Sequence, residues 1–155
     1  MKTNSNSYTI VYSVILVLIV AFLLAFVFQA LKPMQDANVQ LDQQKQILFA
    51  LNQDRNMTNE QAVQLWKKII IADDVINADG KVTEAGKQGG VDAGFKLTSK
   101  DAKEGKLALY RCKVNGEDKY VIPVYGNGLW GPINGFIAIN GDKQTVFGAY
   151  FNHES

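Results

Sequence analysis

The residues with the clearest potential for binding chemistry are the glycines and the tryptophan of the stretch Gly126-Asn127-Gly128-Leu129-Trp130-Gly131. Glycines allow a backbone to approach a planar or phosphate-bearing molecule closely. The indole of Trp130 adds an aromatic face on which such a molecule could stack. The alternative is a tight connection in which Trp130 plugs the core, and the spacing alone leaves both interpretations open.

The stretch matches the pattern Gly-x-Gly-x-x-Gly, but its surroundings exclude a dinucleotide site of the Rossmann type. In such a site a helix begins at the glycines, and its free amides bind the phosphate. Here Pro132, Asn134 and Gly135 lead into another predicted strand. Asp142 also lies well short of the roughly 20-residue spacing to the acid that binds the ribose.

Other chemistries find little support among the remaining residues. Cys112 is the only cysteine, so neither an internal disulfide nor a cysteine-based metal cage can form. His153 is the only histidine, and no Gly-x-Ser-x-Gly motif accompanies it. The stretch Asn77–Gly80 resembles part of a calcium loop, but Val75 and Gly86 occupy the positions where that loop needs acids. We therefore predict no catalytic residue and no metal site.

The charge balance excludes nucleic acid as an expected partner. All 15 acidic residues and 14 of the 16 basic residues follow Lys32, which gives that part of the chain a net charge of −1. Nucleic-acid binding requires clustered lysines and arginines, and no such cluster is present.

The apolar run Ile10–Leu31 predicts a membrane anchor. It has 22 residues and no charge. As a helix it would extend about 33 Å, enough to cross a hydrocarbon core of about 30 Å. A cleaved signal peptide has a shorter apolar region, of about 7–15 residues, that ends at small side chains. Lys2 and Lys32 flank the run almost symmetrically, so the charges leave its orientation open.

A second helix is predicted over Pro33–Leu51. Met34, Ala37, Leu41, Leu48 and Leu51 recur at helical spacing, as in a partly amphipathic stalk. A residue before proline avoids helical geometry, so a break or kink is expected at Lys32-Pro33.

The remainder predicts one α+β domain over residues 58–155. Thr58 and Gln61 have the spacing of a capping box. They precede an amphipathic helix in which Trp66 is expected to be a core residue. Helices followed by antiparallel strands are typical of the α+β class.

Two hairpins are predicted in the second half of this domain. Asn115-Gly116 joins Leu107–Val114 to Glu117–Val124, and pairing Val114 with Glu117 would set Lys113 opposite Asp118. Pro123 cannot donate a ladder hydrogen bond, which indicates an edge position at that point. The second hairpin comprises Phe136–Ile139, the turn Asn140-Gly141 and Thr145–Phe151.

The sequence Tyr120–Ile139, followed by Thr145-Val146-Phe147-Gly148, closely resembles the FMN-binding domain found in the C subunit of the sodium-translocating NADH:quinone reductase. The anchor and the stalk sequence Leu41–Leu48 are similar too. A related subunit of the ion-pumping ferredoxin:NAD reductase shares the flavin domain and the anchor, and is the alternative family. The stalk and the sequence Tyr-Val-Ile-Pro favour the quinone reductase.

The resemblance implies an electron-relay subunit that carries FMN in a bacterial inner membrane. Gly128, Leu129, Trp130 and Gly131 would line the flavin. NADH and quinone would be handled by other subunits of the complex while sodium is pumped. Residues 1–9 would be cytoplasmic, residues 10–31 the span and residues 33–51 the stalk, with the domain in the periplasm.

The chain departs from the family pattern near its end. In that family the flavin phosphate is bonded to a threonine in a Ser-Gly-Ala-Thr motif, and a Glu-Thr-Pro-Gly-Leu-Gly loop helps to enclose it. Neither motif occurs in the 155 residues, which stop at His153-Glu154-Ser155. We therefore expect that the C-terminal part of the domain is missing and that no covalent FMN acceptor is present. A non-catalytic, membrane-anchored assembly subunit is the alternative function.

Overall fold

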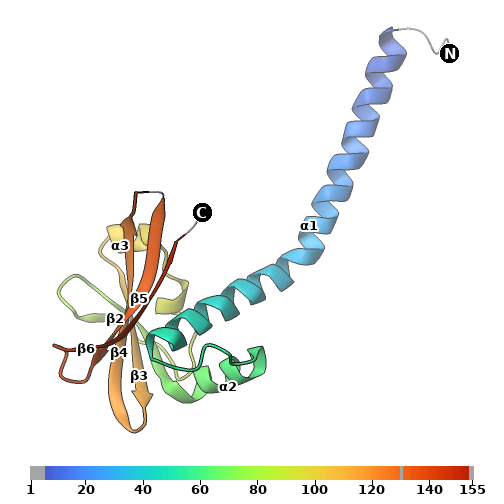
Figure 1. The fold of residues 1–155 in the computed structure, drawn as a ribbon. Helices are drawn as coiled ribbons and strands as arrows, with labels where there is room; N and C mark the ends of the chain where they lie inside the picture. Colours follow the sequence, from blue (N-terminus) through green and yellow to red (C-terminus); the bar gives the residue numbers. More distant parts are fainter. Residues whose placement is uncertain (1–5, 130, 154–155) are drawn as a thin grey trace. The chain divides into compact units, whose positions relative to one another are not determined.

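The computed structural model describes residues 6–129 and 131–153 (Figure 1). In chain order its elements are α1 (Asn6–Ala50), α2 (Asn59–Ile69), β1 (Ile70–Ile76), β2 (Val82–Glu84), the 3-10 turn η1 (Gly94–Lys96), α3 (Ser99–Lys103), β3 (Leu107–Val114), β4 (Glu117–Asn127), β5 (Pro132–Asn140) and β6 (Val146–His153). The chain divides into two compact units between Gln40 and Leu41, and each is described by itself.

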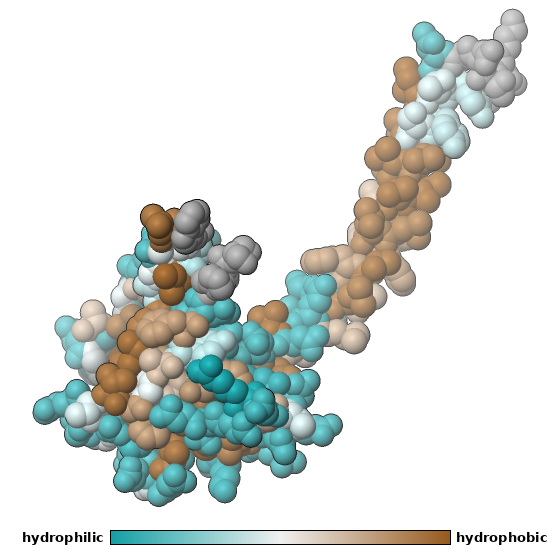
Figure 2. Space-filling model, viewed as in Figure 1, coloured by the Kyte–Doolittle hydropathy of each residue, from teal (hydrophilic) through white to brown (hydrophobic). Residues whose placement is uncertain are grey.

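The first unit contains most of helix α1, including the predicted anchor. Among the described residues, α1 is the one helix that is long and apolar enough to cross a membrane. Its apolar side chains are exposed, as Figure 2 shows along the helix. A helix of this length with apolar residues on every face suits a hydrocarbon environment.

Helix α1 continues through Pro33, so a break at that residue is absent, while the kink that was the other expectation stays a prediction. The predicted anchor and stalk helices form a single helix. Proline removes one backbone donor and crowds the preceding turn, at a cost of about 3 kcal/mol in a helix interior. The many hydrogen bonds on either side of Pro33 outweigh this local penalty.

The second unit is built on a six-stranded antiparallel sheet with the order β2-β1-β3-β4-β5-β6. Both predicted hairpins are confirmed. Val114 pairs with Glu117 and Lys113 with Asp118 in the first, and Ile139 pairs with Val146 in the second. The α+β class is therefore confirmed.

The core of this unit lies between the sheet and the helical residues from Leu41 to Ile69. Ile47 and Leu48 of α1 are fully buried in the same cluster as Trp66 of α2 and Tyr110 of β3. The capping box of α2 is present, since Thr58 accepts from the backbone of Gln61 and the Gln61 side chain accepts from the backbone of Thr58. Trp66 is 1% exposed, which confirms its predicted core role.

Candidate functional site

The predicted ligand loop, residues 128–131, connects β4 to β5. Asn127 and Pro132 form the last pair of the ladder before it. The backbone N–H of Gly128 donates to the carbonyl of Gly131 over 2.8 Å and closes the loop. Gly131 has a φ of +152°, a conformation that favours glycine. Trp130 lies outside the described residues, so its predicted role against a flavin stays a prediction.

The described part of the loop is open at Leu129 but crowded at Gly128, where a Cβ would stand 2.6 Å from Cδ1 of Ile133. Leu129 is 90% exposed. A Cβ on Gly126, at the end of β4, would meet no atom within 4 Å. These residues leave room for a molecule at this end of the sheet, but they do not form an enclosed site by themselves.

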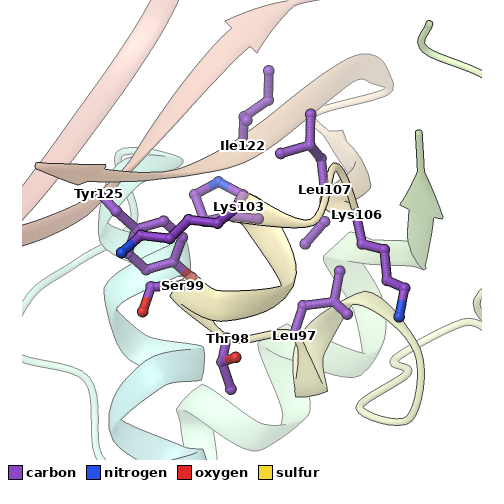
Figure 3. A pocket seen from close by; sticks show the side chains of 11 residues that line it. Leu97, Thr98, Ser99, Lys103, Lys106, Leu107, Ile122 and Tyr125 are labelled. Carbon is purple, nitrogen blue, oxygen red and sulfur yellow. The ribbon is translucent and has the colours of Figure 1, made fainter. Parts of the chain in front are cut away.

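A cavity of about 350 Å³ lies beside α3, near the same end of β4 (Figure 3). Tyr125 lines it and stands three residues before Gly128. Its walls are apolar and come from Leu97, Leu107, Ile122 and Pro123. Polar atoms come from Thr98, Ser99, Lys103, Lys106 and Tyr125, as the labelled side chains in Figure 3 show.

The cavity opens where strands β3 and β4 stop pairing. The register between them ends at Tyr110 and Val121, while β4 continues to pair with β5, through Pro123 opposite Phe136. Pro123 has no N–H to donate toward β3. The prediction of an edge at Pro123 therefore holds only on its β3 side, because β4 is an interior strand of the sheet.

Helix α3 closes one side of the cavity. Both the backbone N–H and the hydroxyl of Thr98 donate to Oδ2 of Asp101, over 2.8 Å and 2.7 Å. These hydrogen bonds, that from the hydroxyl first, lower the pKa of the Asp101 carboxyl. They fix the start of the helix and with it the position of Lys103, its last residue.

The segment that leads to Leu97 is fastened to β1 by two buried carboxylates. Oδ2 of Asp73 accepts from the backbone N–H groups of Ala93 and Phe95, over 3.0 Å and 3.3 Å. Oδ1 of Asp74 accepts from Gly86 over 2.8 Å. Both acids are 1% exposed. Their hydrogen bonds position the segment that forms one wall of the cavity.

The cavity offers a neutral phenol and one lysine that forms no ion pair with the described residues. Burial, and secondarily the charge of Asp101, raise the pKa of Tyr125, so its hydroxyl is a hydrogen-bond donor at neutral pH. Lys106 lies 3.9 Å from Glu104. Within the described ranges 6–129 and 131–153, Lys103 forms no ion pair.

These residues fit a flat, largely apolar ring with polar edges. Ligand sites commonly begin at about 300 Å³ and combine apolar walls with a few polar groups. Across the ladder from Tyr125, Oδ1 of Asn134 is buried and accepts no hydrogen bond from the described residues. Directly paired residues of an antiparallel sheet share a face. A free acceptor therefore lies on the face that Tyr125 occupies, as the polar edge of a flavin would require.

The cavity, α3 and Lys103 were not predicted from the sequence. One signal was present, because Thr98-x-x-Asp101 has the spacing of a helix cap. The five-residue helix is too short for any hydrophobic period to reveal it.

No family model matches the chain. It is 32% identical to the C subunit of the Na(+)-translocating NADH-quinone reductase of Haemophilus ducreyi over 161 residues, which cover 94% of this chain and 62% of that protein. The protein of the same name from Pseudomonas aeruginosa is 28% identical, with 97% and 64% covered. The chain therefore spans less than two thirds of the length of these curated relatives.

A solved structure shows a similar fold. The crystal structure of the protein of the same name from Parabacteroides distasonis matches with a TM-score of 0.71 and 30% identity, over 81% of this chain and 59% of that one. The match supports the α+β fold, and the shared names agree with the family that the residues of the β4–β5 hairpin resemble.

Proposed function

We propose, from its similarity to the C subunits of Na(+)-translocating NADH-quinone reductases, that this chain is a membrane-anchored subunit of such a complex. The observation that carries the proposal is similarity over 94% of the chain to a protein of that name. The apolar part of α1 supplies an anchor of sufficient length. The other subunits of the reductase are the proposed partners.

We further propose that the chain takes part in electron transfer through FMN, held at the end of β4. A bound flavin would supply the redox chemistry, while the protein supplies position, electrostatics and protection from side reactions. Gly128, Leu129, Trp130 and Gly131 would approach the flavin from the loop. The apolar wall at Leu97 and Ile122 would exclude water from its ring.

The 155 residues lack the Ser-Gly-Ala-Thr motif, so no threonine among them is proposed to form a phosphoester. The residues described here would contribute non-covalent contacts to a flavin. The Tyr125 hydroxyl would donate to a polar edge, and the Asn134 side chain offers an acceptor.

The proposed location is the bacterial inner membrane, with the sheet domain in the periplasm. The single candidate span among the described residues supports the anchor. The orientation rests on the family relationship, since the flanking charges are nearly symmetrical.

Co-purification from native membranes tests the proposal. The full chain, carrying an affinity tag at Ser155, should remain in the membrane after an alkaline wash and co-purify with other reductase subunits. Deleting its gene should reduce sodium-stimulated NADH oxidation by quinone. A chain that migrates alone, in cells whose reductase activity is unchanged by the deletion, contradicts the proposal. Intact co-purification without any loss of activity would favour the assembly function.

A further inference from the structure

We propose that Asn115, at the tip of the β3–β4 hairpin, is a site of spontaneous deamidation, where the side-chain amide is converted to a carboxylate. The chain has four Asn-Gly pairs, which begin at Asn115, Asn127, Asn134 and Asn140. Asparagine is thermally labile, and a following glycine favours the reaction because it has no side chain to hinder the attack on the amide. The four pairs are alike in sequence, so only the structure can distinguish them.

The reaction requires two groups that are free to meet. The backbone nitrogen of the glycine attacks Cγ of the asparagine, and the bond from Cγ to the side-chain nitrogen breaks. The proton of the glycine N–H passes to the leaving nitrogen, which departs as ammonia, and a cyclic imide remains. Water opens the imide at either of its two carbonyl carbons, which gives aspartate or isoaspartate. A hydrogen bond on the side-chain amide or on the glycine N–H must therefore break before the attack.

Asn115 and Gly116 meet this requirement. Both are exposed, and they form the two-residue turn between the paired residues Val114 and Glu117. Their φ angles are +52° and +87°, as such a turn requires. Within residues 6–129 and 131–153, no hydrogen bond involves the Asn115 side chain or the N–H of Gly116. Neither the amide that is attacked nor the attacking nitrogen is held by a partner there.

The turn of the second hairpin starts with the same two residues, but its asparagine is held in place. Oδ1 of Asn140 accepts from Nζ of Lys119 over 2.6 Å, and Nδ2 of Asn140 donates to Oγ1 of Thr145 over 2.8 Å. Lys119 is only 4% exposed, so water competes little for its hydrogen bond. Both bonds must break before the amide can turn toward the nitrogen of Gly141.

The other two pairs are held by their backbone. The N–H of Gly128, which would attack Asn127, donates to the carbonyl of Gly131 over 2.8 Å. Asn134 and the buried Gly135 lie inside β5, which pairs with β4 on one side and β6 on the other. A strand held by two ladders cannot bend into the imide ring without losing ladder hydrogen bonds. The structure therefore leaves Asn115 as the least restrained of the four.

Deamidation would change the charge and the length of the turn. Asn115 and Gly116 line a cavity of about 330 Å³ that Lys68 and Lys113 also line. Neither lysine forms an ion pair with the residues that the structure describes. A new carboxylate would therefore arise beside unpaired cations. Isoaspartate would also add one atom to the main chain of a turn that sets the register of the hairpin.

The test follows all four sites in one protein. The chain in detergent micelles is kept at mildly alkaline pH in heavy-oxygen water, either folded or in guanidinium chloride, and peptide mass spectrometry gives the rate at each asparagine. In the folded chain Asn115 should react at least about tenfold faster than the other three, the slowing expected where a hydrogen bond must first break. In the denaturant the four rates should become similar, because the Asn-Gly pair is the same.

Three variants test the role of the hydrogen bonds. Asn115→Gln should abolish most of the deamidation of the folded chain, because attack on the longer side chain would form a less favourable ring. Thr145→Val removes a partner of Asn140 and should speed the reaction at Asn140 without changing that at Asn115. Thr83→Val is the matched control, since the Thr83 hydroxyl donates to the carbonyl of Val75 at the other edge of the sheet. Circular dichroism establishes that each variant is folded.

Each outcome decides for or against the inference, which is independent of the proposed function. A faster or equal rate at any of the other three asparagines in the folded chain would overturn it, as would an Asn115 that stays intact. An equally large lead of Asn115 in the denaturant would assign the effect to sequence and overturn the structural explanation. An unchanged rate at Asn140 in Thr145→Val would overturn the protection assigned to its hydrogen bond.

Discussion

A Cβ on Gly90 would lie 2.1 Å from Oδ1 of Asp73, so these two residues fit together only because Gly90 has no side chain. The loop from Ala85 to Lys96 lies against β1 in this way at three glycines. A Cβ on Gly86 would stand 2.4 Å from the backbone nitrogen of Asp73, and one on Gly94 would stand 2.5 Å from the carbonyl oxygen of Asp74. Close packing of the loop backbone against the backbone of β1 and the Asp73 side chain therefore holds the loop that leads into the cavity wall.

Gly90→Ala is expected to destabilise the fold, by about 1–3 kcal/mol or more, because overpacking forces neighbouring atoms to move. Urea unfolding followed by circular dichroism measures the change. Gly126→Ala is the control, since a Cβ there meets nothing within 4 Å and the φ of Gly126 is not positive. Equal stability losses in the two variants would show that the contact between Gly90 and Asp73 does not cause the loss in Gly90→Ala.

Arg111→Leu is expected to lower the free energy of unfolding by about 3 kcal/mol, because it leaves the buried carboxylate of Asp74 without its cation. Nε of Arg111 donates to Oδ2 of Asp74 over 2.5 Å. Asp74 is 1% exposed, and Gly86 remains as its only backbone donor among the described residues. Lys113→Leu, an exposed substitution on the same strand, should change stability by less than about 0.5 kcal/mol. Urea midpoints of the two variants settle the comparison.

The stability of the fold should fall as pH rises above about 9, the pKa of a cysteine thiol that is not buried, as in the unfolded chain. Burial raises the pKa of Cys112 to about 12, so between these values the unfolded chain loses the thiol proton and the folded chain keeps it. The folded state is then the more protonated one, and alkali favours unfolding. At pH 10.5 this linkage amounts to about 2 kcal/mol.

The alkaline effect of Cys112 is isolated by comparing the wild type with Cys112→Ala in urea titrations at pH 8 and pH 10.5. The variant should lose less stability than the wild type between the two values. Tyr110 contributes to the slope of both proteins, since burial also raises its pKa. Parallel losses in the two proteins would contradict the role of Cys112.

The intact mass of the chain should equal that of the bare polypeptide, even after co-expression with the flavin transferase of the family. None of its threonines follows Ser-Gly-Ala. Thr58 is also occupied as a helix cap, and the Thr145 hydroxyl donates to Asp142 over 2.6 Å. A mass increase equal to FMN less one water, mapped to a threonine, would refute this prediction.

The proposed topology predicts that Cys112 becomes labelled from the periplasmic side. The thiol is 1% exposed, so the domain must first be unfolded in whole and in permeabilised cells. A membrane-impermeant maleimide should then react in both samples. Reaction in permeabilised cells only would place the domain in the cytoplasm.

The parts of the fold that the sequence predicted well are those with strong local signals. Asn115-Gly116 set the first hairpin and its register, and the Thr58–Gln61 spacing located the start of α2. The long apolar run predicted the helix at Ile10–Leu31. In each case neighbouring residues carry the whole signal, so tertiary contacts were not needed to interpret it.

The features that the sequence did not reveal depend on contacts between distant residues. Strand β1 was not predicted, since the adjacent acids Asp73 and Asp74 at its centre interrupt the apolar pattern of a buried strand. Their burial becomes favourable only through Arg111, 37 residues later, and through the backbone of the loop after β2. The cavity likewise requires Pro123 to lie beside the start of β3. At Pro33 the expected break was wrong in the opposite way, because the local effect of the proline did not end a helix that continues on both sides of it.

The three glycines packed against β1 have a consequence for mutational tolerance. A systematic substitution scan of this chain should find that almost no other residue is tolerated at Gly86, Gly90 and Gly94. Such a strict requirement for glycine is usually attributed to phosphate-binding loops. Gly126, beside the proposed flavin, should accept small side chains because open space surrounds it. Intolerance at Gly86, Gly90 and Gly94 would thus mark glycines that serve folding. The proposed cofactor loop would give a mixed result, because a Cβ on Gly128 would stand 2.6 Å from Cδ1 of Ile133 and Gly131 has a φ of +152°.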